Sequence, residues 1–581
     1  MFIIKQKGEG GKVCVHLATS VHRPGKTPHH TRKHLGMLDT DSGELLLARK
    51  ADVPNAVILK LLSEKGITYK GRRAPARGKP PRPLAMVLSD GVHVEEIGRI
   101  AVLSHLSESS GLFNALRMAF GDEDARRLSC AAIHQVCEGE ALYLLDDWLE
   151  DVSGDSCDGV SPSSIGVLAC EVGSKRAMPL RRKFFMAWIK ACGMPRALIH
   201  DTTSISTYSQ RLEDAEWGYN RDDEQLPQMN LALVVAKEAR VPIWHRKLPG
   251  SIPDVASLQG TASQLVDLGL DEFSFTLDRG YFSNANVVAM LSAKIKFAIG
   301  VPLHLKQSVK LVKEHRQSLI AFKRTFLTNG VLVSHVPCEF TVTMKDKEKR
   351  KIPAHLYFCP ERHAQMANRL GKTVLEIAGK AADTTFANRE EAGGWLAENA
   401  RGLSKYLRIG MKSGKPSICV RPDQVAAATD KLGMTLIATS AGKSVSAGKE
   451  EVLVDYRSRD MAEKVFDSYK NATGNNKMRT GDDESAEGRI FIAFLAVTIR
   501  ALMENALRKS EMKKSVTVPE ALALLRKIKR LWRASGQPLL QEVPKKSREV
   551  ALAMGIAPEK MGDAVRVLAR GAGNAARPSH R

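Results

Sequence analysis

Four polar side chains between residues 456 and 470 restrict what this chain can fold into. Tyr456, Arg459, Glu463 and Lys470 follow one another at offsets of three, four and seven residues. On an α-helix, which turns about 100° per residue, they would lie within an arc of roughly 60°. One carboxylate would then be flanked by two cations and a phenol, an arrangement that can hold a metal ion and a phosphate group together. The spacing therefore predicts a single helix over this stretch with all four side chains on one face.

The stretch between residues 195 and 302 predicts a sheet that carries two further acids. Residues 196–201 (RALIHD) form an apolar run that ends in Asp201, which predicts a short buried strand ending in an acid. Residues 273–278 alternate between apolar and polar side chains, which places Asp278 at the end of another strand. The remaining strands predicted here are a hairpin over 229–235 and 241–244 and a single strand over 296–301.

Five blocks follow one another along the chain in a fixed order. They are HDTTSIS at 200–206, WGYNRD at 217–222, LPQMNL at 226–231, LDRGYFS at 277–283 and the spaced residues of 456–470. The last block resembles the YREK signature of bacterial insertion-sequence transposases of the DDE type. The first and fourth blocks resemble that family's two aspartate motifs, and the second and third are similar to other family stretches.

The resemblance implies an RNase H-like core in which Asp201, Asp278 and Glu463 are both the catalytic residues and the metal ligands. The DNA-binding residues that it implies are Tyr456, Arg459 and Lys470. The implied cofactor is Mg²⁺, as two ions about 3.5–4 Å apart, with Mn²⁺ as a substitute. In the family, water attacks first and frees a 3′-hydroxyl, which then attacks target DNA. The implied partners are the inverted-repeat ends of the element and the target DNA, held by a dimer that pairs two ends.

The charge of the chain agrees with a nucleic-acid partner. Lys and Arg number 87 against 64 for Asp and Glu, which gives a net charge of +23. Such a field attracts polyanions, although a basic protein of another kind would show it too. The nine cysteines include no C-x-x-C pair, which fits reduced thiols in a cytoplasm rather than a zinc ribbon or a disulfide framework. The longest apolar run, residues 490–499, is about half of what a bilayer requires, so we expect no membrane segment. The resemblance implies a cytoplasmic, nucleoid-associated location in a bacterium.

The chain predicts an α/β protein in several parts. The expected parts are a small β-rich N-terminal region that could contact DNA (1–69), a basic proline-rich linker (70–83), a helical domain that could bind DNA (84–194), the RNase H-like core in two pieces (195–302 and 436–540), a β-containing insertion between the second aspartate and the glutamate (303–435), and a basic C-terminal tail (541–581). The insertion is expected because 185 residues separate Asp278 from Glu463, too many for the simple fold.

Several alternatives stay open at this stage. Asp201 precedes Thr-Thr-Ser and could instead cap a helix or form an Asx turn. The charge run 222–224 offers other carboxylates for a metal, and the His-rich stretch 22–34 could bind a metal or a phosphate. Trp395 could wedge a flipped base or pack in a core. At the place of a family R-I-x-x-H motif the chain has Ser485, Ala486 and Arg489, so the role of that histidine is not implied.

Two other functions compete with transposition: a transposase-derived DNA-binding protein that no longer cuts, and a host nuclease on the same fold. The intact acids argue against the first. The long N-terminal region and the insertion argue against the second, because a simple nuclease needs neither.

Overall fold

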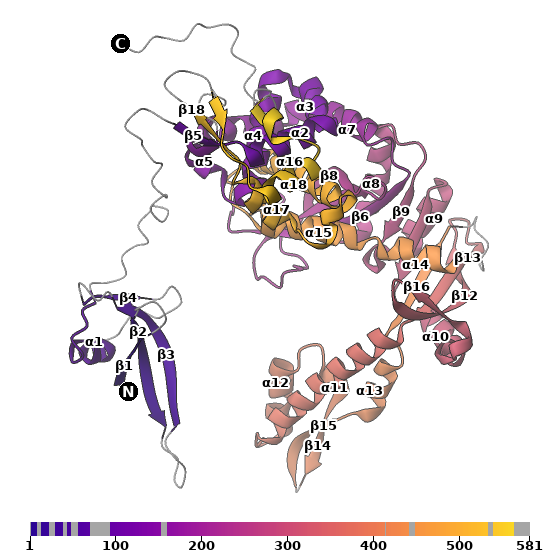
Figure 1. Ribbon diagram of the computed structural model, residues 1–581. Coiled ribbons are helices and arrows are strands. Elements are labelled where there is room, and N and C mark those ends of the chain that lie inside the picture. The colour runs from indigo at the N-terminus through magenta and orange to yellow at the C-terminus, as the bar shows by residue number, and fades with distance from the viewer. Residues whose placement is uncertain are drawn as a thin grey trace, which may run out of the picture. The chain divides into compact units, whose positions relative to one another are not determined.

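The computed structural model describes residues 2–7, 13–21, 29–38, 43–47, 56–69, 93–152, 160–412, 414–440, 448–532 and 538–562 (Figure 1). The chain forms two units, Met1–His93 and Val94–Arg581, and each has a hydrophobic core of its own. The predicted linker, residues 70–83, lies outside the described residues, and so does the predicted tail beyond residue 562.

The N-terminal unit is an antiparallel sheet with one helix. Its strands lie in the order β1 (Phe2–Lys7), β2 (Val13–Val21), β3 (His29–Leu38) and β4 (Leu45–Leu47), and the helix is α1 (Ala56–Ser63). Its core is small and consists of Ile3, Val15, Leu17, Leu35, Leu45, Leu62 and Ile67. The predicted β-rich N-terminal region is therefore confirmed.

The second unit begins with the predicted helices. They are α2 (Gly98–Ser109), α3 (Leu112–Phe120), α4 (Asp122–Glu138), α5 (Leu145–Val152), α6 (Pro162–Gly173) and α7 (Met178–Ala191). Ser161 caps α6: its hydroxyl accepts from the amide of Ser164, and the Ser164 hydroxyl accepts from the amide of Ser161.

The central sheet has the strand order of an RNase H-like core. The strands β6 (Ala197–Thr207), β7 (Gln228–Ala236) and β8 (Val241–Pro249) are antiparallel neighbours, while β9 (Ser274–Leu277) and β10 (Lys296–Val301) continue the sheet parallel to β6. The order β8-β7-β6-β9-β10 confirms the predicted core, including the hairpin and the strand over 296–301. The helices α8 (Asp254–Asp267) and α9 (Asn284–Ser292) follow β8 and β9 along the chain.

The predicted insertion consists of two structurally different parts. After α10 (Lys306–Ile320), the strands β11 (Thr325–Thr328), β12 (Val331–Thr343) and β13 (Lys349–Phe358) extend the core sheet through β16 (Met434–Thr439). The segment between β13 and β16 has a core of its own. It contains α11 (Pro360–Ala382), α12 (Arg389–Asn399), β14 (Leu407–Lys412), β15 (Lys415–Val420) and α13 (Pro422–Thr429), which lie together in Figure 1. Trp395 packs against this core, with its ring 6.0 Å from that of Phe386.

The single helix predicted over residues 456–470 is wrong. Helix α14 (Lys449–Arg457) ends just after Tyr456, α15 (Asp460–Asp467) begins just after Arg459, and a π-helical turn (Ser468–Ala472) carries Lys470. At the junction the amide of Met461 donates to the carbonyl of Ser458, only three residues back, so the chain tightens there. The Ser458 hydroxyl donates to the carbonyl of Asp455, a local bond that competes with regular helix.

One long helix, α16 (Asp483–Lys509), forms the centre of the second unit. Its residues from Ile490 to Ile499 are all buried, and it contacts α2, α4, α6 and β8. By length and composition it could cross a membrane, but 67% of its apolar window is buried inside the protein, as in the core helix of a globular domain. After α16 come α17 (Val518–Leu525), β18 (Lys529–Trp532), β19 (Pro538–Leu540) and α18 (Lys545–Ala553). Strand β18 lies between β19 and β5 (His93–Glu96) in a small three-stranded sheet.

Two glycines let α6 and α16 approach backbone to backbone. A Cβ atom on Gly488 would lie 1.8 Å from the carbonyl oxygen of Ala169, and one on Gly173 would lie 1.8 Å from that of Glu484. Side chains at these points would therefore force the two helices apart.

We expect Gly488→Ala to destabilise the second unit by about 1–3 kcal/mol, because the clash is with backbone that cannot rotate away. The matched control is Gly166→Ala on α6, where a Cβ meets nothing within 4 Å and removal of glycine from a helix should stabilise by about 0.5–1 kcal/mol. Thermal unfolding of the full chain measures both. Equal midpoints for the two variants would contradict the close helix contact.

Candidate active site

The sequence predicted that Asp201 ends a strand, but Asp201 lies in the middle of β6. Strand β6 continues to Thr207, and Asp201 pairs opposite Leu233 of β7. The polar run after Asp201 stays in the sheet because threonine favours strands and because its hydroxyls find partners. The hydroxyl of Thr207, for example, donates to the carbonyl of Met478 at 2.9 Å. Asp201 caps no helix; its own carboxylate accepts the amide of Thr202 at 2.8 Å.

The register of two parallel strands brings Asp201 and Asp278 together. His200 of β6 is paired with Leu277, the last residue of β9. Asp201 and Asp278 are the next residues along each strand. Since neighbouring strands lie about 4.8 Å apart, the two backbones are adjacent at these acids. Asp278 thus stands at a strand end, as predicted.

Glu463 completes the group from helix α15. One cavity of about 410 Å³ is lined by all three acids together with Arg459 and Lys470. The structure therefore brings every predicted metal ligand, and two of the three predicted DNA-binding residues, to one cavity. The Glu463 side chain is 55% exposed and that of Asp278 is 34% exposed, so both are open to a ligand from solvent.

Arg459 and Tyr456 both hold Asp278. The Nη1 atom of Arg459 lies 2.8 Å from Oδ1 of Asp278 and 3.4 Å from Oε1 of Glu463, so the guanidinium bridges the two acids. The Tyr456 hydroxyl donates to the same Oδ1 atom at 3.2 Å. Burial first, and the Asp278 charge second, raise the pKa of Tyr456 above its usual value, so the phenol remains a donor. A DNA contact by Tyr456 stays a prediction, since its side chain is buried against the protein.

Lys470 is already paired with a carboxylate. Its Nζ atom lies 2.6 Å from Oδ2 of Asp222, the first acid of the charge run 222–224. The lysine side chain is only 12% exposed, so it lies in the cavity wall and not in open solvent. A DNA phosphate at this place would have to compete with Asp222.

The cavity is also lined by residues that were not predicted as site residues, among them Arg221, Asp254, Tyr281 and Thr202. Arg221 donates to both carboxylate oxygens of Asp254 at 2.6 Å, and the hydroxyls of Tyr281 and Thr202 are hydrogen-bonded. Asp254 is the first residue of α8 and follows Pro253, a sequence that indicates a helix start but says nothing of a cavity. Arg221 and Tyr281 lie inside the recognised blocks, yet nothing in the sequence shows that they face the acids.

The electrostatics of the cavity favour a cation. Burial raises the pKa of Asp201 to about 7; the Thr202 amide and Arg221 oppose this rise, and the charges of Asp278 and Asp254 add to it. Carboxylate oxygens are the ligands that Mg²⁺ prefers, so the donor set fits that ion. Within the described residues the three acids do not form a group with all ligand atoms within 4.8 Å of one another. The three side chains would therefore have to move closer together to share an ion, and Arg459 lies between two of them, Asp278 and Glu463.

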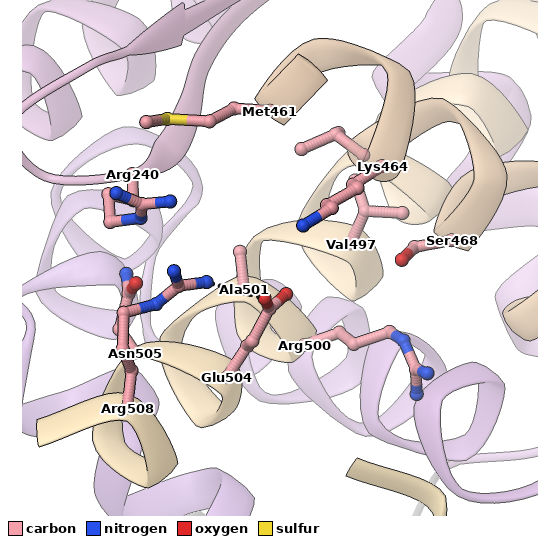
Figure 2. A pocket seen from close by; sticks show the side chains of 11 residues that line it. Arg240, Met461, Lys464, Ser468, Val497, Arg500, Ala501, Glu504, Asn505 and Arg508 are labelled. Atoms are coloured by element: carbon pink, nitrogen blue, oxygen red, sulfur yellow. Dashed lines mark hydrogen bonds and ion pairs between the residues drawn. The ribbon is translucent and has the colours of Figure 1, made fainter. Parts of the chain in front are cut away.

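A second, basic pocket lies on another side of α15. Figure 2 shows Arg240, Lys464, Arg500 and Arg508 around it, with Glu504 as the only acid among its lining residues. Arg508 lies 2.6 Å from Glu504, and its buried Nε has no hydrogen-bond partner among the described residues. Burial lowers the pKa of Arg240 and of Arg500, and Arg508 lowers that of Arg240 further. The pocket thus carries excess positive charge next to the helix that bears Glu463.

Comparison with protein families assigns the chain to a known family. The family model of the transposase DDE domain matches residues 193–499, more than half of the chain, so the protein belongs to that family. No curated protein matches the chain. Among solved structures, the chain is similar to a piggyBac transposase in a synaptic complex with hairpin DNA, at 10% identity over 69% of this chain and 76% of that one. The TM-score is 0.24, a likeness too low to support a conclusion about this chain.

A glycine keeps room for Tyr456 beside Asp278. A Cβ atom on Gly300 of β10 would lie 2.3 Å from the Tyr456 hydroxyl. We expect Gly300→Ala to displace that hydroxyl and to lower DNA cleavage by about 10- to 100-fold, as misplacement of a site by about 1 Å does. Tyr456→Phe should lower it too. The control is Gly410→Ala on β14, where a Cβ meets nothing closer than the Cys419 sulfur at 3.4 Å. If Gly300→Ala cleaved DNA at the wild-type rate while Tyr456→Phe was impaired, Gly300 would not be what positions the Tyr456 hydroxyl.

Proposed function

We propose that this protein is the transposase of a bacterial insertion sequence, which cleaves DNA at the ends of its element and joins the 3′-hydroxyl to target DNA. The observation that carries the proposal is the meeting of Asp201, Asp278 and Glu463 in one cavity, from two parallel strands and a later helix. Family membership supports the same conclusion.

In the proposed reaction the three acids would hold two Mg²⁺ ions, or Mn²⁺ in their place. Such ions activate the attacking oxygen and stabilise the leaving one in phosphoryl transfer. Asp201 has to be ionised to serve as a ligand, and its raised pKa is the cost of crowding acids in a buried place. Asp278 is oriented by the Tyr456 hydroxyl, which fixes one carboxylate oxygen and leaves the other available.

The cations of the cavity are proposed to bind the DNA backbone. When Arg459 leaves its bridge between Asp278 and Glu463, its guanidinium can grip a phosphate beside the reacting one. Lys470 can release its ion pair with Asp222 and bind a second phosphate instead. Fixing the scissile phosphate in line is a large share of catalysis in phosphoryl transfer.

The basic pocket is proposed to extend this path. Its arginines and Lys464 lie on α15, α16 and the turn after β7, so a duplex that reaches Glu463 can also reach them. Pairing of two element ends by a dimer and a nucleoid-associated location follow from the proposed reaction. A non-cutting DNA-binding protein would not need the three acids in one cavity, and magnesium-dependent joining of 3′ ends would exclude a simple host nuclease.

We expect Asp201→Asn, Asp278→Asn and Glu463→Gln each to lower cleavage by at least about 1,000-fold, because each removes transition-state stabilisation. Binding to element-end DNA should remain at the wild-type level, since the phosphate contacts lie elsewhere. Asp271→Asn, at an exposed acid outside the cavity, is the matched control. Cleavage at the wild-type rate by any of the three variants would remove that residue from the site.

The double variant Lys464→Gln/Arg500→Gln tests the basic pocket. Loss of two phosphate contacts should flatten the log–log dependence of DNA affinity on salt by about 0.9 per contact. The single-turnover rate at saturating DNA should not change, because neither side chain touches the acids.

The control is Lys509→Gln, which removes an exposed cation of α16 outside the pocket. It measures how much the loss of one charge alone flattens the salt dependence. If the double variant flattened the salt slope no more than two such exposed substitutions do, the pocket would not be a DNA contact.

A further inference from the structure

The N-terminal unit contains a second group of metal-ligating side chains, far in the sequence from the catalytic acids. Cys14 and His16 lie on β2 and His34 lies on β3, and their ligand atoms all lie within 4.8 Å of one another. Cys14 and His16 are half-buried and His34 is exposed, so the group is open to solvent on one side.

The alternation of β2 points two of these side chains to the same face. Val15 and Leu17 belong to the core of the unit. Cys14 and His16 alternate with them, so they project from the opposite face of the sheet. Two ligands at positions i and i+2 of one strand, with a third on the neighbouring strand, form a three-pronged group on a rigid scaffold.

A β-bulge supplies the third ligand. Val15 pairs with Gly36, but His16 pairs with His34, so Leu35 is an extra residue on β3. In regular pairing His16 would face Leu35. The bulge lets Leu35 enter the core, where it is 2% exposed, and sets His34 directly across from His16. The two imidazole rings lie 4.9 Å apart, centroid to centroid.

We infer that Cys14, His16 and His34 bind a zinc ion through one thiolate and two imidazoles, with water as the fourth ligand. Sulfur and imidazole ligands select Zn²⁺ over Mg²⁺, so this site would not compete for the catalytic ion. Around a tetrahedral zinc the ligand atoms lie roughly 3.5 Å apart. The ligand atoms here lie within 4.8 Å of one another, so each pair has to approach by at most about 1 Å to bind the ion.

The ion would stabilise a unit that has little core of its own. Among the residues of this unit that the structure describes, seven buried apolar side chains form that core, and small domains with so few usually depend on a metal, a disulfide or a partner. The bulge also interrupts the β2–β3 ladder at Val15 and His16. A metal bridge across the same two strands would restore the connection, and its binding free energy would add to folding.

Cobalt substitution of the untagged full-length protein tests the site, because a thiolate ligand gives Co²⁺ a charge-transfer band that carboxylates do not give. We expect one zinc per chain that survives dialysis, and a thiolate-to-cobalt band on replacement. Cys14→Ser should abolish the band, and His34→Gln should weaken zinc binding by at least about 100-fold. Both variants should also lose the rise in unfolding temperature that zinc gives the wild type.

Two controls make the result specific. Cys419→Ser, a half-buried cysteine of the second unit, and Glu463→Gln, at the catalytic acid, should both keep the band. Retention of the band by Glu463→Gln also separates this site from the proposed transposase reaction. Absence of a band in the wild type, or a band that Cys14→Ser leaves intact, would overturn the inference.

Discussion

The pairing of β6 with β9 is the constraint on which the rest of the candidate site depends. Because His200 is fixed opposite Leu277 in a parallel ladder, the next residue on each strand is an aspartate next to an aspartate. A slip by one residue would turn every side chain of β9 to the other face and separate the two acids. The apolar faces of these strands are buried beneath helices, and that burial sets the register. Catalytic geometry thus follows from core packing.

Positive charge lies between Asp278 and the third acid, Glu463. Arg459 supplies it, and the tight turn at Ser458 positions that arginine at the start of α15. The interruption between α14 and α15 therefore affects the geometry of the candidate site. A regular helix would carry Tyr456 and Arg459 on one face of one rod. The observed turn instead lets the phenol and the guanidinium converge on a single oxygen of Asp278.

The sequence predicted helices and strands better than it predicted where they end. Apolar runs and apolar–polar alternation correctly predicted the hairpin of β7 and β8, the strand β10 and the position of Asp278, because each of these depends only on the pattern of neighbouring residues. The end of β6 was misjudged, since the hydroxyls of residues 202–207 look like a turn until their partners on other strands are known. The break at Ser458 was missed because it arises from one side-chain hydrogen bond. The Arg221–Asp254 pair and the Cys14–His16–His34 group depend on tertiary register, which no single-sequence pattern contains.

The central claim is that Asp201, Asp278 and Glu463 together form one metal-binding site. Iron-mediated cleavage of the polypeptide tests it most directly: Fe²⁺ replaces Mg²⁺, and hydroxyl radicals formed at the bound ion cut the nearby backbone. The account predicts cuts next to all three acids at once, and loss of all three together in Asp278→Asn. Cuts at one or two acids only, or cuts near Glu463 that persist unchanged in Asp278→Asn, would contradict it.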